Sequence, residues 1–185
     1  MARDCLPAFE RVFHSLIGLL FLEGIVPPGS VIDAGAFDGA TACFLCRAAP
    51  ERTVHAIEFL PQNVKLIRER YAGACQHLQI HHGGLGEREL NVTIPRGTPM
   101  QRKGWQMDAS WLRKHGRAPG ETSGAKQRVG DTFTRVSRID DLFAPTGPFA
   151  GEKLAFAHWD VEGSEMSVLR GARQTLRTDQ PIFSV

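Results

Sequence analysis

The chain has 185 residues, of which 42% are hydrophobic and 23% charged, and its formal net charge is +2. This length is enough for one domain with a buried core, and the composition is ordinary for a globular protein. The small net charge excludes the strongly basic character that would by itself indicate a nucleic-acid partner. Four cysteines are too few for a disulfide scaffold in a chain of this size, so we expect a reducing, cytoplasmic location.

Residues 1–29 are expected to form an N-terminal helix that packs on the core. The helical pattern runs from Phe9 to Phe21, and its most apolar part, Leu16 to Leu22, is far too short to span a bilayer. The residues at helical spacing are Phe9, Val12, Phe13, Leu16, Ile17 and Leu20. We therefore expect one face of this helix to cover the domain formed by residues 30–185.

A glycine loop follows the first expected strand. The sequence from Val31 to Gly39 reads Val-Ile-Asp-Ala-Gly-Ala-Phe-Asp-Gly, and it predicts a buried strand, a tight turn and a helix beginning at Ala40. Gly35 and Gly39 let the backbone approach a ligand closely. Asp33 differs from a dinucleotide fingerprint, because its charge would oppose a pyrophosphate. A carboxylate suits a cofactor with an ammonium and a sulfonium group, which predicts S-adenosylmethionine.

Glu58 ends the second expected strand, which runs from Thr53. An acid about 20 residues after the glycine loop, at the tip of this strand, is positioned to accept hydrogen bonds from both ribose hydroxyls of a nucleoside cofactor. The alternative is that Asp33 and Glu58 only cap helices or face solvent.

Strands and helices then alternate along the chain. The expected elements are a helix over residues 62–71, strands over 78–82, 90–94 and 154–159, a helix around 166–176, and a strand from 181. This alternation predicts an α/β fold with a doubly wound, mostly parallel sheet and helices on both faces. Ligands of such sheets bind beyond the carboxyl ends of the strands, where Asp33, Glu58, Gly84 and Asp160 would meet. His81 and His82 are adjacent on a strand and point to opposite faces, so we do not expect them to share a metal ion.

A basic, glycine- and proline-rich insertion is expected at about residues 95–138, with Trp105 and Trp111 among its arginines and lysines. Irregular insertions of this length are usually functional or disordered. Either a solvated loop or a substrate lid fits this composition. Its cations and aromatic rings would suit an anionic or sugar-like acceptor, or single-stranded nucleic acid.

The acidic turn after residue 159 is the candidate reaction centre. Asp160, Glu162 and Glu165 follow a buried strand, and His158 lies two residues before Asp160. Methyl transfer to oxygen depends on positioning and on removal of the hydroxyl proton, for which a carboxylate or an imidazole is a suitable general base. The three carboxylates also suggest Mg²⁺, and the simpler alternative is that they favour the N-terminus of the next helix.

These motifs together resemble FkbM-type methyltransferases. They are residues 33–39, 58–61, 137–142, 160–165 and 168–172, and the similarity extends from about Val31 to the C-terminus. The resemblance implies a class I, Rossmann-like, S-adenosylmethionine-dependent methyltransferase fold, and O-methylation of a hydroxyl on a sugar, glycan or natural product. The expected cofactor-binding residues are Asp33, Gly35, Ala36, Phe37, Asp38, Gly39, Glu58, Phe59, Gly84 and Leu85. The expected catalytic residues, bordering the acceptor, are Asp160, Glu162 and His158.

In that family the sheet usually continues through two further strands as an antiparallel hairpin. Here Val185 follows the fifth core strand, so we expect a sheet without the hairpin and with an exposed edge. A partner or a second copy covering this edge, or a fragment of a longer chain, would account for it. The alternative functions are a truncated, catalytically impaired domain that binds cofactor, glycan or nucleic acid and, less favoured because of Asp33, an NAD-dependent oxidoreductase.

Overall fold

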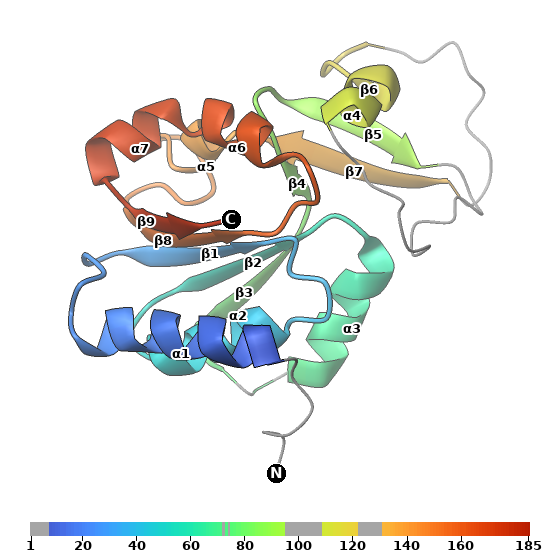
Figure 1. Ribbon diagram of the computed structural model, residues 1–185. Helices are drawn as coiled ribbons and strands as arrows, with labels where there is room; N and C mark the ends of the chain where they lie inside the picture. The colour runs from blue at the N-terminus through green and yellow to red at the C-terminus, as the bar shows by residue number, and fades with distance from the viewer. Residues whose placement is uncertain (1–7, 72, 74, 95–108, 122–130) are drawn as a thin grey trace.

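The structure, a computed structural model, describes residues 8–71, 73, 75–94, 109–121 and 131–185. It contains a five-stranded parallel sheet in the order β3-β2-β1-β8-β9 and a four-stranded sheet in the order β4-β7-β5-β6 (Figure 1). The helices are α1 (Ala8–Leu22), α2 (Ala40–Ala48), α3 (Pro61–Tyr71), α4 (Ala109–His115), α5 (Ile139–Leu142), α6 (Glu165–Gly171) and α7 (Arg173–Asp179). The strands are β1 (Ser30–Ala34), β2 (Val54–Glu58), β3 (Leu78–His82), β4 (Gly84–Leu85), β5 (Leu90–Ile94), β6 (Gly116–Arg117), β7 (Thr132–Ser137), β8 (Leu154–Trp159) and β9 (Ile182–Ser184).

The five-stranded sheet is covered on both faces. Helices α1, α2 and α3 lie on one face, and α5, α6 and α7 lie on the other (Figure 1). Every residue of β1 and β2 is buried, as is typical of parallel strands between two helical layers. The strand order is that of a doubly wound sheet with its reversal between β1 and β8, which confirms the predicted fold class. The sheet of the described residues ends at β9.

Helix α1 buries a narrower face than its sequence predicts. Ile17 is buried against the core that includes Val31 and Phe156, and Phe13 packs beside it. Val12 and Leu16, which we expected on the same face, are exposed, because the apolar stripe is wider than the helix face in contact with the sheet. Among the described residues, no helix is long and apolar enough to cross a membrane.

Part of the expected irregular insertion is regular structure. Strand β7 pairs antiparallel with β5 over five residue pairs, from Leu90 with Val136 to Ile94 with Thr132. Thr134 and Val136 are buried while Arg135 is exposed, so the two-residue alternation was a strand signal within the basic composition. Residues 95–108 and 122–130, including Trp105, lie outside the described residues, so neither the lid nor the loop interpretation is tested there.

Cys46 and Cys75 form a disulfide with a Cα–Cα distance of 6.3 Å. It joins α2 to the segment before β3. No sequence pattern indicated this pairing, because it depends on the packing of α2 against β3, which brings together residues 29 positions apart. Cys43 is buried and has a free thiol.

Candidate cofactor crevice

Asp33 lies near the carboxyl end of β1 and is almost completely buried, at 1% exposure. Its Oδ2 atom has no hydrogen-bond partner among the described residues. Burial, followed by the negative charge of Asp160, raises the pKa of Asp33 to about 7, against the lowering effect of a hydrogen bond from the backbone N–H of Ala42. A buried carboxylate with a free oxygen is costly unless a ligand or a proton satisfies it.

Glu58 is held in a fixed orientation at the end of β2. Its Oε1 atom accepts hydrogen bonds from the backbone N–H of Leu60 at 2.7 Å and the side-chain amide of Asn63 at 3.3 Å. Its Oε2 atom accepts a hydrogen bond from the backbone N–H of Phe37 at 2.8 Å. Burial raises the pKa of Glu58, and these hydrogen bonds oppose that rise. The sequence had no signal for Asn63, because its role depends on the angle at which α3 leaves β2.

The glycine loop rests directly on the acidic turn. Gly35 has φ +80°, and a Cβ atom there would overlap the backbone carbonyl of Asp160. The backbone N–H of Asp160 also donates to the carbonyl of Ala34 at 3.0 Å. The loop reaches β2 as well, since the N–H of Gly35 donates to the carbonyl of Ile57 at 2.9 Å. The structure therefore brings the first predicted acid, the loop and the acidic turn together, as the topology predicted.

The end of the glycine loop is strained and partly occupied by protein contacts. Phe37 has φ +46° and a 62% exposed side chain, which is uncommon for a large residue. Asp38 accepts a hydrogen bond from the N–H of Ala40 at 3.0 Å and pairs with Arg70 at 2.6 Å. The carboxylate of Asp38 thus accepts a hydrogen bond from the first residue of α2 and forms an ion pair with Arg70 of α3. We expected both Phe37 and Asp38 to bind the cofactor. Of the two, Phe37 has the exposed side chain, whereas that of Asp38 is engaged by Ala40 and Arg70.

Gly84 and Leu85 follow β3 and contribute differently from each other. Gly84 packs against the ring of Phe59, where an added Cβ atom would lie 2.8 Å from a ring carbon. Leu85 is buried in the core with Ile57 and Trp159, so its side chain faces away from the crevice. Ala36 is buried beside Ile67.

The carboxylates of the acidic turn do not converge. Asp160 and Glu162 are both exposed, and Glu165 accepts a hydrogen bond from the N–H of Gly163 at 3.0 Å. Within the described part of the chain, no group of three or more His, Cys, Asp or Glu side chains is arranged to hold a metal ion. The arrangement therefore gives no support to the Mg²⁺ site that the sequence suggested.

His158 faces β9 and α1. Its Nδ1 atom lies 3.0 Å from the hydroxyl oxygen of Ser184, and its ring centroid is 4.9 Å from that of Phe13. Burial lowers the pKa of His158, with Asp160 opposing the shift. The contacts with Ser184 and Phe13 explain the position of His158, so a catalytic role is not needed to explain it.

Residues 33–185 match the family model described as "Methyltransferase FkbM domain". The chain belongs to the FkbM methyltransferase family. The matched range in this FkbM methyltransferase begins at Asp33 itself and includes Glu58 and the acidic turn. The family and the doubly wound sheet together support a class I methyltransferase.

Two solved structures are similar over part of the FkbM methyltransferase chain. Precorrin-6y C5,15-methyltransferase from Geobacter metallireducens GS-15 is 18% identical with a TM-score of 0.33, over 45% of this chain and 42% of that one. Monomeric WbdD is 22% identical with a TM-score of 0.31, over 45% of this chain and 19% of that one. The chain thus spans less than half the length of either structure. No curated protein matches the sequence.

Proposed function

We propose that the protein transfers the methyl group of S-adenosylmethionine to a hydroxyl oxygen on a sugar, glycan or natural-product molecule. The observation that carries this proposal is the buried carboxylate of Asp33, whose Oδ2 atom lacks a partner among the described residues, beside a loop that admits no Cβ atom at Gly35. A cation is the ligand that such a carboxylate favours most.

The residues of the crevice fit this cofactor. Asp33 would accept hydrogen bonds from its ammonium group, and the backbone of the loop around Gly35 would lie against its methionyl part. When bound, the cofactor supplies an electrophilic methyl group on a sulfonium. A dinucleotide fits less well, because its pyrophosphate would lie near both Asp33 and Asp160, whose charges already repel each other.

Glu58 would bind the ribose through one oxygen. A carboxylate oxygen has two acceptor positions, and Oε1 already receives two hydrogen bonds, from Leu60 and Asn63. Oε2 accepts a hydrogen bond from the N–H of Phe37, and we propose that its second acceptor position takes a ribose hydroxyl. The sequence suggested that Glu58 accepts both hydroxyls, and this geometry supports the narrower proposal of one.

Asp160 is the residue we propose as general base. It is exposed at the crevice, and its backbone touches the loop that would hold the cofactor. A carboxylate there can accept the proton that an alcohol loses as it attacks the methyl carbon. Glu162 is exposed one residue after Val161 and would border the acceptor.

Parallel calorimetric titrations with S-adenosylhomocysteine and NAD test the cofactor. We expect saturable binding of S-adenosylhomocysteine only, and a loss of at least about tenfold in affinity for Glu58→Gln, since one charged hydrogen bond contributes about 1.5–3 kcal/mol. Glu69→Gln is the matched control, because Glu69 is exposed and pairs only with Lys65 among the described residues. Binding of NAD alone, or equal affinities for the two variants, would overturn the assignment.

The acceptor requires a separate experiment. Incubation with isotopically labelled S-adenosylmethionine and a pool of hydroxylated metabolites and glycans, followed by mass spectrometry, identifies the product. We expect label on oxygen, and we expect Asp160→Asn to lower the rate by about 10²-fold or more, as loss of a general base does. Label on carbon or nitrogen would refute O-methylation without affecting the cofactor result.

A further inference from the structure

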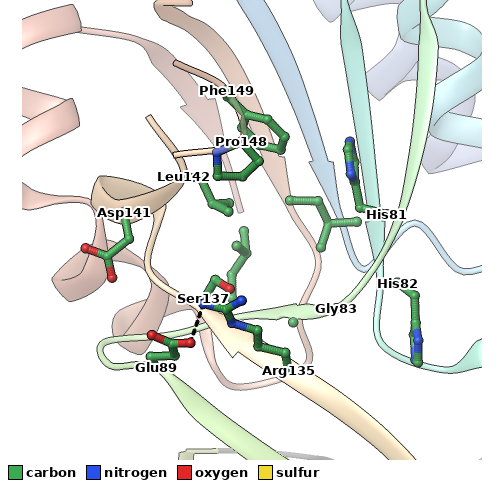
Figure 2. A pocket seen from close by; sticks show the side chains of 13 residues that line it. His81, His82, Gly83, Glu89, Arg135, Ser137, Asp141, Leu142, Pro148 and Phe149 are labelled. Carbon is green, nitrogen blue, oxygen red and sulfur yellow. Dashed lines mark ion pairs between the residues drawn. The ribbon is translucent and has the colours of Figure 1, made fainter. Parts of the chain in front are cut away.

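A cavity of about 220 Å³ lies between β2, β3 and the segment leading from α5 to β8 (Figure 2). Its apolar wall consists of Ile57, Leu85, Leu142, Pro148 and Phe149. His81 lines it from β3, and the ion pair of Arg135 with Glu89 lies at one end (Figure 2). Ile57 points into this cavity, so the next residue, Glu58, points to the opposite face of the strand. The side chains of Ile57 and Glu58 therefore lie on opposite faces of β2, although Gly84 and Leu85, which we expected to bind the cofactor, also line this cavity.

A chain of hydrogen bonds ends at this cavity. Glu152 Oε2 lies 2.9 Å from His55 Nε2, and His55 Nδ1 lies 3.1 Å from His81 Nε2. His55 is completely buried, and the ring of Phe149 stacks on it with a centroid distance of 3.9 Å. The sequence missed this network because it depends on the register of β2 with β3 and on the fold of the segment carrying Glu152.

The tautomers of the two rings decide what His81 can offer. A carboxylate of Glu152 only accepts, so His55 Nε2 carries a hydrogen. In the tautomer in which His55 Nδ1 carries no hydrogen, His81 Nε2 donates to it, and His81 Nδ1 is an acceptor with no hydrogen-bond partner among the described residues. Burial, followed by the nearby His55, lowers the pKa of His81 to about 4, so its ring is uncharged at neutral pH.

We propose that this cavity binds a small uncharged aromatic molecule with one hydroxyl group, a phenol, whose O–H donates to His81 Nδ1. A dry cavity of about 150 Å³ lined by aliphatic and aromatic residues is enough to hold benzene. The volume here, about 220 Å³, leaves room for one ring and its substituents. The ring lies among Ile57, Leu142 and Phe149, and the acceptor nitrogen sets its orientation.

The test compares phenol with toluene, which has nearly the same shape but no donor. Titration calorimetry on the full chain should give phenol the higher affinity by roughly five- to tenfold, which is the contribution of one hydrogen bond. Saturating S-adenosylhomocysteine should leave the phenol affinity unchanged, because the side chains of Ile57 and Glu58 lie on opposite faces of β2. Absence of saturable phenol binding, equal affinities for phenol and toluene, or competition with S-adenosylhomocysteine would overturn the proposal.

Two variants locate the ligand. His81→Phe keeps a ring but removes the acceptor, so the preference for phenol over toluene should disappear, whereas His77→Phe, at an exposed position, should keep it. Leu142→Trp fills the cavity and should abolish binding of both probes while leaving the hydrogen-bond chain intact. A preference retained in His81→Phe refutes the assignment. If that variant does not fold, the ¹⁵N resonance of His81 Nδ1 in the unmodified protein decides, since it should shift with phenol and not with toluene.

Discussion

Asp33 makes the stability of the ligand-free protein depend on pH. The pKa of its carboxyl group is about 7 in the folded state, against an ordinary value of 3.8. Between these values the folded chain binds one proton more than the unfolded chain, so the free energy of unfolding falls as the pH rises. The contribution is fully present below about pH 4 and lost above about pH 7. A shift of this size corresponds to a few kcal/mol, about 1.4 for each unit.

We therefore expect Asp33→Asn to remove most of this fall. Chemical denaturation at pH 5 and pH 8 should show a smaller difference in the free energy of unfolding for Asp33→Asn than for the unmodified protein. At pH 8 the variant should be the more stable protein and should not bind S-adenosylhomocysteine. Glu69→Gln should behave like the unmodified protein at both pH values. The same slope in Asp33→Asn and the parent chain would show that other groups carry the pH dependence.

Asp140 connects two helices, because it lies on α5 and its carboxylate accepts hydrogen bonds from N–H groups at the N-terminus of α7. Its Oδ1 atom accepts hydrogen bonds from the N–H groups of Gln174 and Thr175, at 3.0 and 2.9 Å, and from the hydroxyl of Thr175. Its Oδ2 atom pairs with Arg138 at 2.9 Å. These N–H groups have no partner within the helix, so the carboxylate replaces a local cap. The motif from Ser137 to Leu142 is one of those that resemble the FkbM family. In the structure, its residue Asp140 stabilises the N-terminus of α7.

Asp140→Ala should lower the free energy of unfolding by about 2 kcal/mol, because it removes a cap of α7 and one of the two ion pairs that Arg138 makes with described residues. Asp141→Ala is the matched comparison, since the side chain of Asp141 is 51% exposed and, within the described part of the chain, makes one ion pair. It should cost less than about 0.5 kcal/mol. Urea denaturation of both variants measures the difference. Equal losses would mean that Asp140 does not stabilise α7.

At the element level, the sequence predicted the strands whose pattern is local and missed those that depend on distant partners. The strand over residues 78–82 was predicted, and the expectation that His81 and His82 point apart is confirmed: His81 contacts His55, while His82 contacts Thr134. Strand β7 was missed because the basic composition around it outweighed its alternation. At the proposed cofactor site, the positions of Asp33 and Asp160 at the ends of their strands predicted that the two residues lie close together. No local sequence pattern shows that Asp33 Oδ2 has no hydrogen-bond partner among the described residues.

At the scale of the whole molecule, the Cys46–Cys75 disulfide closes a loop of 29 residues that contains all of β2 and α3. A cross-link of this span restricts the unfolded chain and stabilises the fold by about 3 kcal/mol or slightly more. The disulfide therefore stabilises the half of the sheet that carries Glu58, although the two cysteines lie outside the proposed cofactor site.

Reduction should accordingly lower the guanidinium midpoint of the protein, and Cys75→Ser should lower it to the same value with or without reductant. The buried free thiol gives the control, because Cys43→Ser should keep the response to reductant. Alkylation of the unfolded chain followed by mass spectrometry counts the thiols. Modification of Cys46 and Cys75 without prior reduction would show that the bond does not form.

The close contact between Gly35 and the carbonyl of Asp160 has a consequence for engineering. The loop that we propose for the methyl donor and the turn that we propose for the acceptor share one backbone junction, so neither can be redesigned as an independent module. A graft that exchanges the turn at Asp160 to change substrate preference must keep its main-chain path against Gly35, or it will displace the loop that we propose as the binding site of the methyl donor.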